Sequence, residues 1–224
     1  MFLIAMCGGS ASGKSRIISL LKEHFKEDLS VIDMDNYYYS HDELSYEERK
    51  QINYDVPESL DIDKIIEDIE QLKKGSVVEQ PFFSFQTYRR EQKTEKTKPA
   101  KILIVDGIFS LHFEKLRKMY DLKIFVDVDS EVRFARRIVR NMKLYQRPVE
   151  FEVEQWFTKV KPMYEKYVEP CRQYGDLILP FYENNNSSLA FLIEIIENRT
   201  SVVKTEKEID DIKIRIVRRF DGRT

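Results

Sequence analysis

The chain has 224 residues, which suits one α/β domain, and its 42% hydrophobic content is enough for a substantial core. A formal net charge of −2 gives no global attraction to nucleic acid or to an anionic membrane, and the apolar run at the N-terminus is too short to span a bilayer. The two cysteines, Cys7 and Cys171, form no metal-binding pattern, so we expect reduced thiols in a cytoplasmic protein.

The chain begins with a short apolar strand, 2–6, which is followed by a glycine-rich loop and by apolar residues at helical spacing over 17–25. The loop fits the phosphate-binding pattern Gly-x-x-x-x-Gly-Lys-[Ser/Thr] in full. Its residues are Gly8, Gly9, Ser10, Ala11, Ser12, Gly13, Lys14 and Ser15. Glycines let backbone N–H groups approach phosphate oxygens, and the helix N-terminus adds partial positive charge. The pattern predicts that Lys14 reaches the β- and γ-phosphates of a nucleotide and that Ser15 ligates Mg²⁺.

Further strands and helices alternate along the rest of the chain. We expect strands at 31–33, 102–105, 122–128 and 176–180, and helices at 60–73, 130–145, 150–167 and 189–196. The aromatic segment 81–88 predicts a hairpin, whereas the charged run 91–98 predicts a solvated loop. This alternation predicts an α/β fold with a doubly wound, mostly parallel sheet. We expect a single domain over 1–200, followed by a charged extension, 201–224, that no pattern assigns.

Carboxylates follow two of the predicted strands, at the edge of a parallel sheet where ligands bind. Asp106 ends the strand 102–105 and would face the phosphate loop, where it could hold Mg²⁺. The alternative is a turn or helix-capping aspartate. Asp33 and Asp35 follow the strand 31–33. A kinase needs a carboxylate near the acceptor hydroxyl, and Asp35 is the candidate, although both residues could be turn aspartates.

The predicted helix 130–145 carries a row of basic residues that continues beyond its end. These residues are Arg133, Arg136, Arg137, Arg140, Lys143 and Arg147, and their spacing places them on one helical face. Such a row is a solvated face, a nucleic-acid-binding surface or a lid that clamps phosphates. The phosphate loop and the near-neutral net charge favour a lid at about 133–150, whose arginines stabilise charge on a transferring phosphoryl group.

In their order along the chain, these motifs resemble the uridine/cytidine kinase family of the phosphoribulokinase group, from the phosphate loop to about Pro180. Residues 35–38 look like the family's Asp-x-Phe-Tyr motif, and residues 53–61 are similar to its Asn-Phe-Asp-His-Pro-x-x-Phe-Asp segment. Residues 81–90 resemble its base-reading hairpin, Pro-x-Tyr-Asp-Phe-x-x-His-x-Arg. The remaining matches are 106–108 to Glu-Gly-Ile, 136–141 to Arg-Arg-Ile-x-Arg-Asp, Gln155 to Gln-Tyr and 160–163 to Val-Lys-Pro-Met.

The resemblance implies a P-loop NTPase fold, a three-layer α/β/α arrangement with a mostly parallel sheet, a β-hairpin excursion at about 81–98 and an arginine-bearing lid helix. It implies phosphorylation of a nucleoside 5′-hydroxyl, most simply that of uridine or cytidine, with ATP (or GTP) and Mg²⁺. Members of the family are often homotetramers, although no interface pattern is visible here, and we expect neither a nucleic-acid nor a membrane partner.

The same resemblance assigns roles to individual residues. The expected catalytic residues are Asp35 (as base), Lys14, Arg137 and Arg140. Besides the loop residues 8–15, Arg140 and Arg147 would bind the nucleotide. The expected nucleoside-binding residues are Asp35, Tyr38, Asp55, Phe83, Phe85, Tyr88, Arg137, Arg147 and Gln155. The expected metal ligands are Ser15, Asp35 and Asp106.

Departures from the family pattern concentrate where the base is read. The family's hairpin histidine is Tyr88 here, its tyrosine is Phe83, its aspartate is Ser84, and Tyr145 stands at one lid arginine position. These changes keep open another acceptor, such as pantothenate, phosphoribulose or nicotinamide riboside, and a regulatory protein that binds ATP without turnover. The hairpin aromatics could also simply pack its core. We retain a slight preference for pyrimidine nucleosides.

Overall fold

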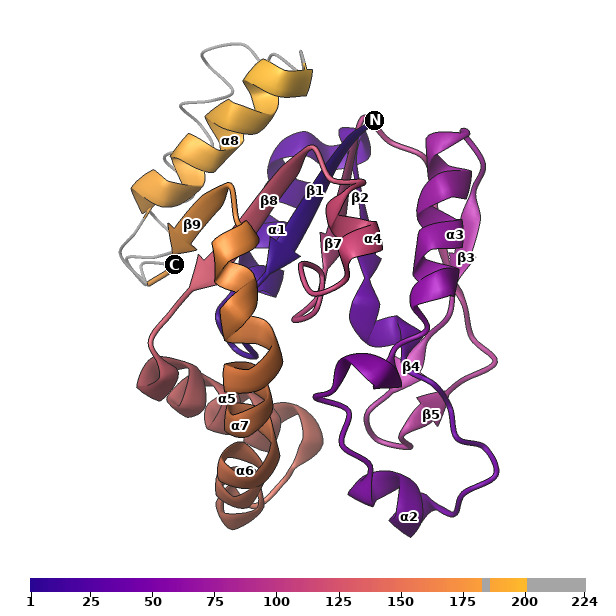
Figure 1. Ribbon diagram of the computed structural model, residues 1–224, viewed down its shortest axis with the longest axis vertical. Helices are drawn as coiled ribbons and strands as arrows, with labels where there is room; N and C mark the ends of the chain where they lie inside the picture. Colours follow the sequence, from indigo (N-terminus) through magenta and orange to yellow (C-terminus); the bar gives the residue numbers. More distant parts are fainter. Residues whose placement is uncertain (183–185, 201–224) are drawn as a thin grey trace.

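Five parallel strands form the central sheet of the protein, whose computed structural model describes residues 1–182 and 186–200. Their spatial order is β2 (Leu29–Asp33), β7 (Ile102–Asp106), β1 (Phe2–Cys7), β8 (Leu122–Asp127) and β9 (Leu177–Pro180). Every pairing within this sheet is parallel, so the carboxyl ends of all five strands meet at one edge (Figure 1). The strands expected from the sequence are confirmed.

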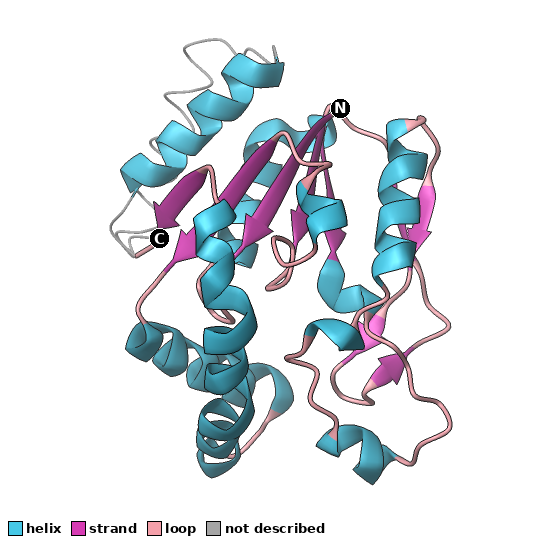
Figure 2. Cartoon of the chain, in the orientation of Figure 1, coloured by secondary structure: helices cyan, strands magenta, loops and turns pink. Residues whose placement is uncertain are grey.

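Helices cover both faces of this sheet, as Figure 2 shows. On one face, α1 (Lys14–Phe25) and α8 (Asn186–Thr200) pack against alternate strand residues such as Ile4 and Met6. On the other face, α3 (Ile62–Lys73) packs with Leu3 and Ala5. The alternation of strand side chains between two buried faces explains why the strands are almost wholly apolar. The expected three-layer α/β/α arrangement is confirmed.

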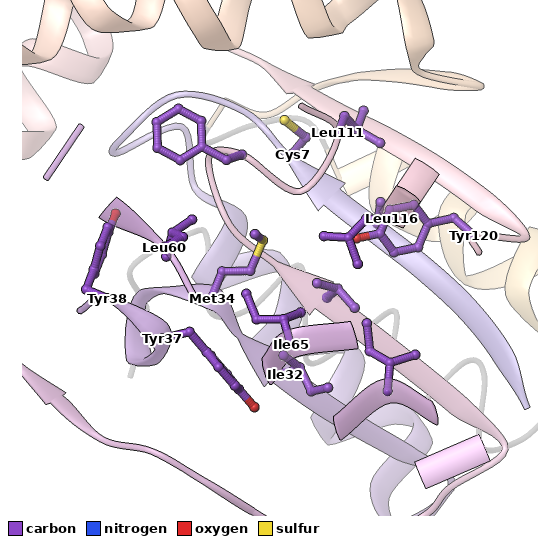
Figure 3. Packing of buried hydrophobic residues seen from close by; sticks show 14 of the residues in the cluster. Cys7, Ile32, Met34, Tyr37, Tyr38, Leu60, Ile65, Leu111, Leu116 and Tyr120 are labelled. Carbon is purple, nitrogen blue, oxygen red and sulfur yellow. The ribbon is translucent and has the colours of Figure 1, made fainter. Parts of the chain in front are cut away.

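The core between the sheet and α3 fixes the turn that follows β2. Figure 3 shows Met34 and Tyr37 of this turn packed with Ile32 and with Ile65 of α3. Tyr37 is fully buried, and its hydroxyl donates a hydrogen bond of 2.8 Å to Oδ2 of Asp68. This core also includes Leu116 from the short helix α4 (Glu114–Arg117). The turn is therefore anchored at both ends.

An excursion between α3 and β7 contains two small antiparallel pairs. In the first pair, β3 (Val78–Gln80) lies beside β6 (Glu95–Thr97), and in the second, β4 (Phe83–Ser84) lies beside β5 (Arg89–Arg90). The hairpin expected at 81–88 is confirmed, and the expected solvated loop over 91–98 is confirmed for 91–94 but is wrong for 95–97, which form a strand. Thr97 is buried and accepts a hydrogen bond from the buried Gln80 amide, while Glu95 and Lys96 remain exposed. A short strand thus forms at the end of a charged segment, with its last side chain buried.

A helical region forms the side opposite this excursion (Figure 1). It comprises α5 (Ser130–Tyr145), α6 (Val149–Gln155) and α7 (Lys161–Met163), with π-helical turns at Trp156–Val160 and Tyr164–Val168. The helix expected over 150–167 is therefore present but interrupted by wider turns. Two short helices were not expected, namely α4 and α2 (Tyr46–Gln51). Helix α2 begins at Ser45, whose hydroxyl and backbone form a capping box with Glu48.

The expected single basic face of the lid is wrong. After α5 ends, Gln146 adopts φ 53°, a left-handed conformation that turns the chain, so Arg147 lies beyond the helix. Arg133 is buried beside the phosphate loop, and Lys143 is exposed. Side chains that seemed equivalent in the sequence thus have different surroundings. The charged extension 201–224 lies outside the described residues.

Cys7 and Cys171 are free thiols, and both are buried. This agrees with the expectation of unpaired cysteines. Within residues 1–182 and 186–200, we find no helix with the length and apolar character needed to cross a membrane.

Candidate active site

A cavity of about 570 Å³ opens at the carboxyl ends of the strands. The phosphate loop and the carboxylates at the ends of β2 and β7 form its floor, α5 with Arg147 beyond it forms one wall, and the hairpin forms the other. Its lining includes Ser10, Ala11, Gly13, Lys14, Ser15, Asp35, Tyr38, Asp55, Phe85, Asp106, Arg137, Arg140 and Arg147. Most residues that the sequence selected therefore meet in one place, although they come from segments far apart in the chain.

The phosphate loop has the backbone geometry that its glycines permit. Gly8 has φ 142° and Gly13 has φ 100°, which are conformations that residues with a Cβ rarely adopt. A Cβ on Gly13 would lie 2.5 Å from a ring carbon of Phe181. Nζ of Lys14 donates hydrogen bonds to the carbonyl oxygens of Gly8 at 2.8 Å and Gly9 at 3.3 Å. These bonds hold the ammonium group against the loop, in a position where it could also contact a phosphate oxygen.

Three carboxylates gather where β2 and β7 end, because Asp33 and Asp106 are register partners. Asp33 caps the following turn, with its Oδ1 accepting from the backbone N–H of Asp35 at 3.0 Å. Burial raises the pKa of Asp106 to about 6, against the opposing effect of Lys14. The cavity walls partly desolvate Asp35 and raise its pKa too, while Lys14 and Arg140 act in the opposite direction.

This floor fits a magnesium ion. Oδ1 of Asp106 is buried and has no hydrogen-bond partner within the described part of the chain. Ser15 is exposed in the same cavity. No ready-made group of three His, Cys, Asp or Glu ligands occurs among residues 1–182 and 186–200. Mg²⁺ in kinases commonly uses one or two protein ligands and takes the others from phosphate oxygens and water, so this sparse set is compatible with it.

The lid arginines make separate contacts. Nη1 of Arg137 donates to Oγ of Ser10 in the phosphate loop at 2.9 Å. Nη2 of Arg147 donates to the hydroxyl of Tyr88 at 2.7 Å and to the carbonyl of Phe85 at 3.2 Å. One arginine thus reaches the nucleotide side of the cavity, and the other reaches the hairpin.

Aromatic rings build the wall on the hairpin side. Tyr38, Tyr54, Phe83 and Phe85 contact one another with centroid distances of 5.2–5.8 Å, mostly edge to face. Tyr54 also stacks on Tyr88 at 5.8 Å. Asp55, next to Tyr54, lines the same cavity, and burial raises its pKa while Arg137 lowers it. A flat apolar group beside a polar one would fit against this wall.

Several expected site residues lie outside the cavity lining. Phe83 is buried within the aromatic wall, and Tyr88 lines an adjoining cavity of about 370 Å³ on the other side of Arg147. Gln155 is the last residue of α6 and is not among the residues that line the main cavity. The ligand roles assigned to all these residues remain predictions.

The sequence reasoning also missed three residues. Tyr54 belongs to the family-like segment 53–61, for which the resemblance implies no role at this position, although Tyr54 lines the cavity. Asn141 lines the cavity as well, and Glu152 lies directly behind it. A lone glutamate among the four of segment 150–165 carries no signal in the sequence that sets it apart.

Comparisons with known proteins agree with this geometry. The model of the phosphoribulokinase/uridine kinase family matches residues 3–188. A uridine kinase of Lactobacillus johnsonii is 37% identical over 204 residues, which are 90% of this chain and 97% of that protein. A uridine kinase of Clostridium novyi is 35% identical over 196 residues, covering 87% of this chain and 94% of the relative.

Solved structures with low sequence identity share the fold. A D-glycerate 3-kinase from Cryptococcus neoformans superposes with a TM-score of 0.60 at 12% identity, covering 80% of this chain and 86% of that one. A phosphoribulokinase from Rhodobacter spheroides superposes with a TM-score of 0.58 at 12% identity, covering 80% and 69%.

Proposed function

The chain belongs to the phosphoribulokinase/uridine kinase family and is a P-loop small-molecule kinase, and we propose that it phosphorylates the 5′-hydroxyl of a pyrimidine nucleoside, uridine or cytidine. The donor is ATP (or GTP). One observation carries the proposal: a single cavity joins the phosphate loop, Asp35 and the lid arginines Arg137, Arg140 and Arg147 to an aromatic wall with a carboxylate beside it.

Asp35 and Asp55 would serve the acceptor. Asp35 stands on the anchored turn after β2, between the phosphate loop and the aromatic wall, where it orients the 5′-hydroxyl and takes its proton. Asp55 accepts hydrogen bonds from the ribose hydroxyls. The rings of Tyr38, Tyr54 and Phe85 pack on the nucleobase, and Tyr88 with Arg147 reads its edge.

Cationic side chains would serve the phosphates. Lys14 exchanges its bonds with the loop carbonyls for oxygens of the β- and γ-phosphates, while Arg137, Arg140 and Arg147 stabilise the charge that spreads over the transferring group. Ser15 and Asp106, with Asp35 nearby, would hold Mg²⁺. The bound ion neutralises phosphate charge during transfer.

Steady-state ADP release with Mg-ATP tests the proposal. The acceptors are uridine, cytidine, adenosine, nicotinamide riboside, pantothenate and ribulose 5-phosphate, and Asp35→Ala is the control variant. Turnover with a pyrimidine nucleoside that Asp35→Ala loses would support the proposal. Turnover with another acceptor alone would identify a different substrate. This outcome is worth testing because Phe83 and Tyr88 replace the family's tyrosine and histidine in the hairpin. ATP binding without turnover on any acceptor would refute catalysis.

The proposal also includes the localisation and the oligomeric state of the protein. The free buried thiols fit a cytoplasmic enzyme. A homotetramer follows only from the family resemblance, and sedimentation of the purified protein tests it.

A further inference from the structure

The contacts of the lid converge on one buried carboxylate outside the cavity. Glu152 of α6 is 1% exposed, and its two oxygens face the arginines of the lid. Oε2 lies 3.3 Å from Nε of Arg137, and Oε1 lies 3.5 Å from Nη1 of Arg147. Buried carboxylates are rare unless they are paired, and here the partners are two cations that the proposed reaction needs.

Asn141 extends these contacts to a third arginine. Its Nδ2 donates to Oε2 of Glu152 at 2.7 Å, and its Oδ1 accepts from Nε of Arg140 at 3.0 Å. Asn141 is itself 1% exposed, and its amide group bridges Arg140, which lines the cavity, and the carboxylate of Glu152 behind it. All three arginines predicted to bind phosphate are thus held by the pair Asn141–Glu152.

The guanidinium groups of two of these arginines also donate hydrogen bonds to opposite sides of the cavity. Arg137 donates to Ser10 of the phosphate loop, and Arg147 donates to Tyr88 and Phe85 of the hairpin. Both arginines have long, flexible side chains, which would otherwise lose much rotamer freedom on binding a ligand. A single carboxylate lies within ion-pair distance of both side chains in the protein without ligands.

We propose that Glu152 is a positioning residue that ties the nucleotide-side and acceptor-side arginines of the lid into one preorganised unit. The inference rests on the proposed kinase function and adds a role for a residue that touches neither substrate. Its negative charge also lets several cations lie close together around the cavity, because it lowers their mutual repulsion. The negative charge within this buried group matters, so a neutral isostere at residue 152 should not replace Glu152, whereas a carboxylate at the neighbouring position 141 should.

The first test compares Glu152→Gln with a charge relocation. Glu152→Gln keeps the shape and loses the charge. The double variant Asn141→Asp/Glu152→Gln returns a carboxylate to the neighbouring position, within hydrogen-bond distance of residue 152. Glu154→Gln, an exposed residue on the same helix, is the matched control. We measure kcat and KM for both substrates, and the affinity for Mg·AMP-PNP by calorimetry.

We expect Glu152→Gln to lower kcat/KM for ATP and for the nucleoside together by about 10- to 100-fold, as displacement of a catalytic group by 1 Å does. The affinity for Mg·AMP-PNP should fall as well. The double variant should recover to within about threefold of the original, because a carboxylate again lies in this buried group, beside Arg140 and within hydrogen-bond distance of residue 152. Glu154→Gln should behave like the unmodified protein.

Two results would overturn the inference: normal kinetics in Glu152→Gln, or a double variant as impaired as the single one. If Glu152→Gln does not fold, the double variant carries the test alone, and a loss of tenfold or more then counts against the inference. Calorimetry needs no acceptor. Absence of turnover by the unmodified protein therefore refutes the proposed function, whereas the Mg·AMP-PNP affinities of the variants still decide the role of Glu152.

Discussion

Replacement of Asp106 by asparagine should stabilise the ligand-free protein against unfolding and should strongly lower its kinase activity. Asp106 ends β7, is 8% exposed, and has one oxygen without a hydrogen-bond partner among the described residues. Its charge is tolerated at neutral pH at a cost to folding, and Asp35 nearby adds repulsion. Asparagine keeps the shape and removes that charge.

The magnitude follows from the pKa of Asp106. Burial raises this pKa from 3.8 to about 6, a shift of about 2 units, which corresponds to ~3 kcal/mol. The folded state holds the proton up to about pH 6, whereas the unfolded chain releases it near pH 4. Stability is therefore lost as the pH rises through this window, and the cost is complete above it. Asp106→Asn should remove most of the cost.

Urea unfolding at about pH 4 and at pH 8 measures the effect. At pH 8, Asp106→Asn should be more stable than the original by ~2–3 kcal/mol, and near pH 4 the difference should be small. Asp63→Asn, whose side chain is 89% exposed, is the control and should show no such trend. A pH-independent difference, or a variant less stable at pH 8, would refute the reasoning. Magnesium-dependent ADP release should fall by about 100-fold or more.

Three further variants test other parts of the site. Asp35→Asn should lower kcat by at least about 100-fold, and because burial raises the pKa of Asp35, the acid limb of the original pH–rate profile should lie above the range of an ordinary carboxylate; a limb near pH 3.8 would contradict this. Arg147→Lys loses the paired donation to Tyr88 and the hairpin, so the nucleoside KM should rise about tenfold in initial-rate assays, and an unchanged KM would remove Arg147 from acceptor binding. Gly13→Ala forces a Cβ into φ 100° against Phe181 and should cost about 2 kcal/mol in urea unfolding; equal stability would show that the loop can relax.

Local patterns were enough to predict the sheet and the floor of the site. Continuous β-branched runs identify strands buried on both faces, and the phosphate loop combines a strand, glycines and a helix start within 25 residues. The carboxylates at strand ends then follow from the geometry of parallel sheets, which brings Asp33 and Asp106 into register. Such features depend on neighbours in the sequence, so the sequence reveals them.

The walls of the site depend on distant contacts and were harder to predict. The sequence predicts a loop over 91–98, but 95–97 pair with β3, where the buried side chains of Gln80 and Thr97 meet. The left-handed Gln146 redirects the chain and takes Arg147 off the helical face on which periodicity placed it. The end of the helix at 145 is predicted correctly, but the direction that the chain takes after it depends on the left-handed conformation of Gln146, which periodicity does not reveal.

The site combines charges that folding alone would not select. Asp106 and Ser12 each have a buried oxygen with no hydrogen-bond partner in the described ranges, and both lie at the phosphate-binding floor. Groups left unpaired in this way cost about 1–3 kcal/mol each unless a ligand satisfies them. Glu152 shows the other solution, since its buried charge is paired entirely with groups of the protein. The floor thus presents unpaired oxygens to the cavity, whereas in the lid a carboxylate outside the cavity lining offsets the charge of the arginines, although Nε of Arg137 still has no hydrogen-bond partner among the described residues.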